Sequence, residues 1–148
     1  MLTVKSILVP TDFSEHSDRA LKQALDIARP NKAKLYLLHV VHEAMHQCAS
    51  DYCLSDELMQ QMDAGMMSAA QQYLEKQLAR FPEAKEVEVV PLVRRGFPSD
   101  EILREQQEKG IDLIVIAPLG RTGIARFLVG SVTKNVVKES KCPVLVAK

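Results

Sequence analysis

The sequence of 148 residues contains no tryptophan, and its aromatic residues amount to only 5%. Proteins that bind single-stranded nucleic acid stack bases on aromatic side chains, so this composition argues against such a surface. Nineteen basic side chains balance nineteen acidic ones, which gives a net charge of zero. A chain without a positive field gives no reason to expect nucleic acid or an anionic membrane as a partner.

Long apolar segments and paired cysteines are also missing. No run approaches the roughly 20 apolar residues that a membrane helix needs, and the N-terminus lacks the basic and apolar regions of a signal peptide. The three cysteines are an odd number, which fits reduced thiols better than a disulfide framework. The sequence therefore predicts a cytoplasmic protein with one domain over residues 1–148, long enough to bury a core without metal or disulfide support.

The sequence does contain an alternation of apolar runs and amphipathic segments. Strands are predicted at 4–9, 35–41, 87–93, 113–117 and 143–147, and helices at 14–30, 58–81, 98–110 and 131–140. Pro30 and Pro82 are expected to end the first two helices. The strands are nearly continuous apolar runs, which is typical of a parallel sheet covered on both faces. The prediction is an α/β, doubly wound domain with a five-stranded parallel sheet in the order 3-2-1-4-5.

The first strand ends next to a candidate ligand-binding residue. In doubly wound sheets ligands bind outside the carboxyl ends of the strands where the strand order reverses, here between the first and fourth strands. Asp12 follows the first strand and could accept hydrogen bonds from a ribose hydroxyl or an adenine amine. The alternative is that Asp12 or Ser14 simply caps the following helix.

The fourth strand is followed by a segment that contains Gly120, Gly123 and Gly130. Glycines permit close backbone approach, and a helix that begins at Ser131 would present unpaired N–H groups to phosphate oxygens. Ser131 and Thr133 add hydroxyl donors at the same place. The alternative is a flexible glycine loop followed by a serine cap.

Several segments resemble the universal stress protein family over essentially the full chain. They are ILVPTDFSE, LLHVV, GFPSDEIL and GSVTKNVVKESKCPVLVAK. Nucleotide-binding members of that family carry G-x2-G-x9-G-[ST] after the fourth strand, and the matching positions here are Ala117, Gly120, Gly130 and Ser131. The nine-residue spacer 121–129 is intact. The resemblance implies an adenine nucleotide alpha hydrolase-like fold and a stress-response protein that binds ATP, AMP or a related adenine nucleotide, alone or with magnesium.

The resemblance also implies which residues form the site. Pro10, Thr11 and Asp12 would face the adenosine, the backbone of Val40 would meet the adenine, and Ala117, Pro118 and Leu119 would line the ribose side. Gly120, Gly130, Ser131 and Val132 would surround the phosphates, with Thr133 beside them. Arg121 is placed to approach a phosphate, or it is an exposed loop arginine.

The sequence departs from the family pattern where Ala117 replaces the first glycine and Pro118-Leu119 replaces a small polar residue and a histidine. The added methyl group is tolerable only at negative φ, and Pro118 removes one backbone donor. The alternative function is therefore a dimeric interaction module that binds no nucleotide. Because segment 121–133 holds no carboxylate or histidine, little or no ATP hydrolysis is expected.

The remaining candidates lie outside this motif. His42, His46, Cys48 and Cys53 carry side chains that zinc prefers, in a spacing that matches no standard zinc pattern, so a metal-binding or redox-responsive loop at 42–53 is a secondary hypothesis. Met59, Met62, Met66 and Met67 are expected to fill the core. The last strand is expected at a sheet edge, and the resemblance implies a homodimer through this strand, with Val144 and Val146 among the contacts.

Overall fold

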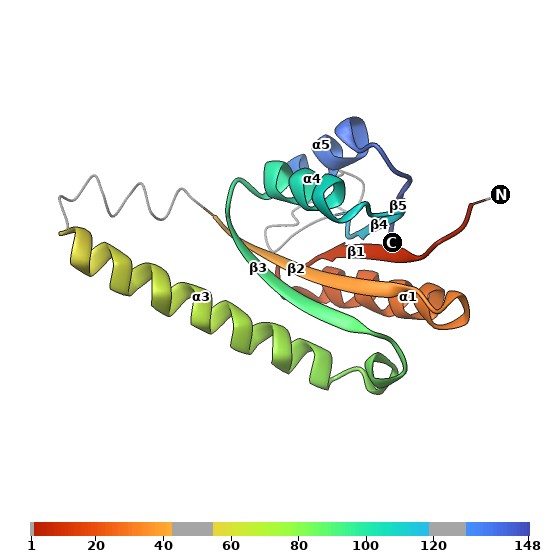
Figure 1. The fold of residues 1–148 in the computed structure, drawn as a ribbon, viewed down its shortest axis with the longest axis horizontal. Coiled ribbons are helices and arrows are strands. Elements are labelled where there is room, and N and C mark those ends of the chain that lie inside the picture. The colour runs from red at the N-terminus through yellow and green to blue at the C-terminus, as the bar shows by residue number, and fades with distance from the viewer. Residues whose placement is uncertain (1, 43–54, 119–129) are drawn as a thin grey trace.

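The computed structural model describes residues 2–42, 55–118 and 130–148, which form a parallel sheet covered by helices (Figure 1). The strands are β1 (Ser6–Pro10), β2 (Lys34–His42), β3 (Val89–Gly96), β4 (Leu113–Ile116) and β5 (Val144–Val146). Their order is β3-β2-β1-β4-β5, and every neighbouring pair is parallel. The predicted doubly wound α/β architecture is confirmed, with β1 beside β4 where the strand order reverses.

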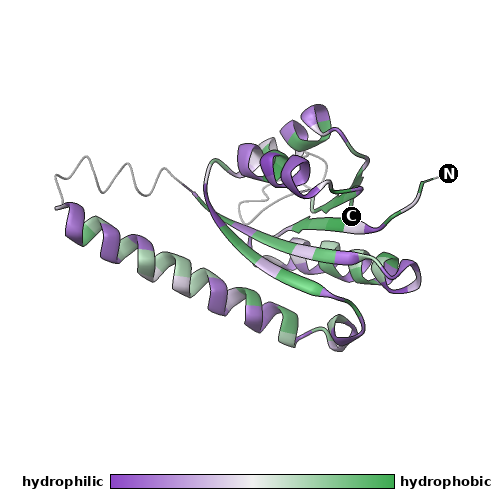
Figure 2. Ribbon diagram, in the orientation of Figure 1, coloured by the Kyte–Doolittle hydropathy of each residue, from purple (hydrophilic) through white to green (hydrophobic). Residues whose placement is uncertain are grey.

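Two pairs of helices cover the two faces of the sheet (Figure 1). Helices α1 (Glu15–Asn31) and α3 (Asp56–Ala79) lie on one face, and α4 (Pro98–Lys109) and α5 (Ser131–Glu139) lie on the other. A short 3-10 helix, η1 (Pro82–Glu86), connects α3 to β3. The strands are mostly apolar in Figure 2, whereas the helices alternate between apolar and polar positions, as expected for elements that cover an apolar sheet.

Successive strand residues divide the core into two clusters. Ile7, Val9 and Leu35 pack with α1 and α3 in one cluster, whereas Leu8 and Leu38 pack with α4 and α5 in the other. The division follows from the two-residue period of a strand, whose side chains point alternately to opposite faces.

Two helix ends differ from the prediction. Pro30 lies inside the last turn of α1, which continues to Asn31 and is closed by Lys32 in the left-handed conformation (φ 53°). Helix α3 ends at Ala79 and not at Phe81, because Pro82 disfavours the helical conformation in Phe81, whose φ and ψ are −118° and 95°.

The methionines of α3 do not fill the core as expected. Met62 is 43% exposed, and none of Met59, Met66 and Met67 is buried. The buried side chains of this helix, Ala70, Leu74 and Gln77, all belong to its C-terminal half. Figure 1 shows the N-terminal half of α3 running past the end of the sheet.

An ion cluster joins β3 to α4. The Arg94 Nε atom lies 3.0 Å from a carboxylate oxygen of Glu101, and its guanidinium also pairs with Glu105 and Glu108. Gly96 permits this approach, because a Cβ atom built on it would lie 2.8 Å from the Glu101 Cγ atom. Across the described residues, no helix is both long enough and apolar enough to cross a bilayer.

Candidate functional site

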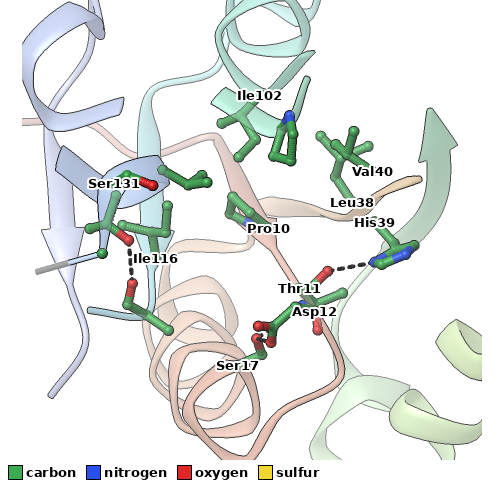
Figure 3. A pocket seen from close by; sticks show the side chains of 15 residues that line it. Pro10, Thr11, Asp12, Ser17, Leu38, His39, Val40, Ile102, Ile116 and Ser131 are labelled. Carbon is green, nitrogen blue, oxygen red and sulfur yellow. Dashed lines mark hydrogen bonds between the residues drawn. The ribbon is translucent and has the colours of Figure 1, made fainter. Parts of the chain in front are cut away.

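A cavity of about 300 Å³ lies at the carboxyl ends of β1, β2 and β4 (Figure 3). This volume is at the lower end of the range for ligand pockets, about 300–1,000 Å³. The predicted site residues that line it are Pro10, Thr11, Asp12, Val40, Ala117, Gly130, Ser131, Val132 and Thr133. The lining also includes residues that were not predicted as part of the site, namely Ser17, Leu38, His39, Pro98, Ile102 and Ile116.

The other predicted residues are placed differently. Pro118 does not belong to the lining, and its carbonyl accepts a hydrogen bond from the Gly130 amide at 2.6 Å. Leu119, Gly120 and Arg121 lie outside the described residues, so their roles stay predictions.

Three of the four candidate metal ligands also lie outside the described residues, because His46, Cys48 and Cys53 fall in the segment 43–54. His42 is exposed at the end of β2, and its ring meets the Phe97 ring edge-on at 5.7 Å. Within the part of the chain that the structure describes, no group of three or more histidine, cysteine, aspartate or glutamate side chains could hold a metal ion.

Asp12 lines the cavity and also organises the start of α1, whereas its contact with a ligand stays a prediction. Its Oδ1 atom accepts hydrogen bonds from the Ser14 amide (3.0 Å) and the Ser17 hydroxyl (2.7 Å). Ser14 is the N-cap of α1, and its hydroxyl oxygen accepts the Ser17 amide. The Asp12 carboxylate is therefore held in one orientation at the edge of the cavity.

The residues between β1 and α1 form a tight turn centred on Phe13. Phe13 has a φ of 66°, a left-handed conformation that is uncommon for a residue with a bulky side chain. The Thr11 hydroxyl accepts the Phe13 amide (3.1 Å) and donates to Gln77 of α3 (2.9 Å). The Phe13 ring contacts the rings of His39 and Tyr73, at 4.4 and 5.4 Å between centroids. These contacts fix the turn against β2 and α3.

The backbone of Val40 faces the cavity. Along β2 the amide of Lys34 and the carbonyl of Leu38 bond to the β1 side, whereas the Leu35 amide bonds to the β3 side. Because the amide and carbonyl of one strand residue point to the same side and this side alternates, those of Val40 point toward the β1 side. Strand β1 ends at Pro10, paired with Leu38, so both groups of Val40 lie beyond its last residue.

The N-terminus of α5 forms the opposite wall. Gly130 is its N-cap, and the first amides of the helix, at Ser131, Val132 and Thr133, have no acceptor within the helix. These amides and the helix dipole favour an anion. The Thr133 hydroxyl donates its proton to the Ala117 carbonyl at 2.7 Å, and its expected role as a donor to a ligand stays a prediction.

Ala117 occupies the first glycine position of the motif without backbone strain. Among the described residues, only Phe13 and Lys32 carry a side chain at positive φ, so Ala117 has a negative φ. Its carbonyl is fixed by the Thr133 hydroxyl, and the Pro118 carbonyl is fixed by the Gly130 amide. These two bonds hold the end of β4 against the start of α5.

Comparison with known proteins gives consistent results. The model of the universal stress protein family matches residues 3–148. Universal stress protein MJ0531 of Methanocaldococcus jannaschii is 33% identical over 144 residues, which cover 97% of this chain and 82% of that protein. The solved structure of protein MJ0577 from the same organism has a TM-score of 0.84 and 31% identity, and the match covers 99% of this chain and 96% of the other. A universal stress protein from Archaeoglobus fulgidus, solved in complex with dAMP, shares the fold at a TM-score of 0.59 and 21% identity, with 100% of both chains covered.

Proposed function

The chain belongs to the universal stress protein family, and on that premise we propose that it is a stress-response protein that binds ATP, AMP or a related adenine nucleotide. The nucleotide occupies the cavity at the carboxyl ends of β1, β2 and β4. Figure 3 shows Val40 and Ser131 on opposite sides of this cavity. One observation carries the proposal. The backbone of Val40, beyond the end of β1, lies on one side of the cavity, and the N-terminus of α5 lies on the other.

The Val40 side of the cavity suits adenine. The Watson–Crick edge of adenine presents an acceptor, N1, next to a donor, the N6 amine, and a strand residue presents one N–H and one C=O. The side chains of Leu38, Ile102 and Ile116 offer apolar surface to the base. Guanine presents a donor and an acceptor in the reverse order, so this backbone edge favours adenine.

The α5 side suits the phosphates. Their oxygens would accept hydrogen bonds from the amides of Ser131 and Val132 and would lie at the positive end of the helix dipole. Asp12 lies on the β1 side, where its carboxylate would accept a ribose hydroxyl. Leu119, Gly120 and Arg121 complete the site in this proposal. The dAMP complex of the Archaeoglobus fulgidus protein indicates that the fold can accommodate an adenine nucleotide.

Titration of the wild-type protein with ATP, ADP and AMP, each with and without Mg²⁺, tests the proposal. A ligand at 100 times its dissociation constant stabilises a protein by about 2.7 kcal/mol, which raises the Tm of a domain of this size by about 5–10 °C. GTP is the control and should raise the Tm less. An unchanged Tm at millimolar ATP would contradict nucleotide binding. ATP turnover at about 1 s⁻¹ would contradict the expectation of little or no hydrolysis.

We also propose that the protein works in the cytoplasm as a homodimer joined through β5. This strand lies at the edge of the sheet, and the side chains of Val144 and Val146 are half-buried. The Pro143 carbonyl accepts the Ile114 amide, and the Ala147 amide donates to the Ile116 carbonyl, so the backbone groups of these two β5-side residues face β4. Because the direction alternates along a strand, the backbone groups of Val144 and Val146 point away from β4. These outward groups could pair with the same strand of a second copy.

The dimer can be tested with a proline at Val146. Val146→Pro removes an outward N–H while it leaves the bonds to β4, so light scattering should report the 16.5 kDa monomer for this variant and twice that mass for the wild type. Val146→Ala, which keeps the N–H, is the matched control and should stay dimeric. A wild-type monomer at tens of micromolar would exclude this assembly.

A further inference from the structure

The ladder between β1 and β2 is interrupted by a histidine side chain. The Thr11 amide donates to the Leu38 carbonyl at 2.8 Å, as the last regular rung. In a continuing parallel ladder, the Thr11 carbonyl would next accept the amide of Val40. It instead accepts a hydrogen bond from Nδ1 of His39 at 2.8 Å (Figure 3). Because a carbonyl oxygen can only accept, the Nδ1 atom of His39 carries the proton.

The following rung is replaced in the same way. A continuing ladder would join the Phe13 amide to the Val40 carbonyl. The Phe13 amide instead donates to the Thr11 hydroxyl, and the chain turns away at the positive φ of Phe13. The two groups that would pair with the Val40 backbone, the Thr11 carbonyl and the Phe13 amide, are thus bonded to side chains instead, and Val40 lines the cavity.

We propose that His39 is a positioning residue for adenine selectivity: its bond to the Thr11 carbonyl holds that carbonyl away from the Val40 amide, so that the amide stays directed at the base. The inference rests on the proposed nucleotide site and adds a residue to it. Contact with the Phe13 ring at 4.4 Å holds the imidazole in its orientation. Without the imidazole donor, the Val40 amide would take the Thr11 carbonyl and would no longer be directed at adenine N1.

Two substitutions at this position separate the hydrogen bond from packing. His39→Phe keeps a ring for contact with Phe13 but removes the donor. His39→Asn loses the ring but places an amide nitrogen two bonds from Cβ, as the Nδ1 atom of histidine is. We expect His39→Phe to weaken ATP binding about tenfold, the effect of one lost hydrogen bond, and to reduce the preference for ATP over GTP by the same factor.

His39→Asn should keep both the ATP affinity and the preference within about threefold of the wild type, which is less than one hydrogen bond is worth. His42→Ala is the control, because this histidine lies on the same strand, is exposed and does not line the cavity. If His39 mattered only for packing, the reverse order would be expected, and His39→Asn would lose more ATP affinity than His39→Phe.

Hydrogen exchange in the absence of nucleotide gives a second measurement. The Val40 amide should exchange more slowly in His39→Phe than in the wild type, because it gains the Thr11 carbonyl as an acceptor. An unchanged exchange rate, or an unchanged ATP-to-GTP preference in a variant that still binds ATP, overturns the role of His39 and leaves the proposed function standing. A wild-type protein that binds neither nucleotide overturns the proposed function itself and the inference with it.

Discussion

Replacing Gly130 with aspartate is expected to lower the affinity for ATP about 100-fold while the protein stays folded, because about 2.7 kcal/mol of binding energy is lost. Two unit charges 5–6 Å apart repel by about 3 kcal/mol at an effective dielectric constant of 20, and the new carboxylate would face the phosphates at the start of α5. The helix itself should gain stability. Gly130 has a φ of −60°, which any residue can adopt, and aspartate is a favoured N-cap.

Gly130→Asn is the matched control, because asparagine has nearly the same shape as aspartate and caps a helix equally well without a charge. Isothermal titration of both variants with ATP should show a large loss for aspartate and a loss of less than about threefold for asparagine. Thermal unfolding without ligand should place both Tm values at or above that of the wild type. If both variants lose affinity equally, a phosphate group does not lie at the start of α5.

The order of the strands could be predicted from the sequence, whereas the ends of the elements depend on individual residues. Continuous apolar runs predict buried parallel strands, and the order 3-2-1-4-5 follows from covering both faces of the sheet. Pro30 did not end α1: the helix continues to Asn31 and ends where Lys32 takes the left-handed conformation, with the Lys32 amide bonded to the carbonyls of Ala28 and Arg29. The apolar pattern of α3 also predicted burial for Met62, but a periodic pattern cannot show where the covering sheet ends.

The candidate site was predictable where it follows the ends of β1 and β4, because the strand order places those ends together. Ile102 and Pro98 were missed since they come from α4, whose position over the cavity is a tertiary feature. His39 was missed for a local reason. It lies two residues after the core residue Leu37 on the same face of β2, and its bond to Thr11 lies beside the positive φ of Phe13, a conformation that sequence rules assign to glycine or asparagine.

Arg94→Met is expected to lower the free energy of unfolding by about 3 kcal/mol, the lower end of the cost of breaking a buried ion pair. Arg94 contacts the carboxylates of Glu101 and Glu105, whose side chains are only 8% and 4% exposed. Burial lowers the pKa of Arg94, but hydrogen bonds and charge attraction from Glu108 and Glu105 outweigh it, so the pKa lies above its ordinary value. The arginine is therefore charged throughout the accessible pH range.

The loss should stay near 3 kcal/mol because two other cations remain beside the acidic pair after the substitution. Arg104 contacts Glu101 at 2.8 Å and Lys109 contacts Glu105 at 3.3 Å. Urea denaturation would measure the difference, with Arg95→Met as the control. Arg95 is the next residue along β3, its side chain is 43% exposed, and it pairs with Asp63, so its removal should cost less than about 1 kcal/mol. Equal losses for the two variants would mean that solvent, and not Arg94, compensates the buried carboxylates of α4.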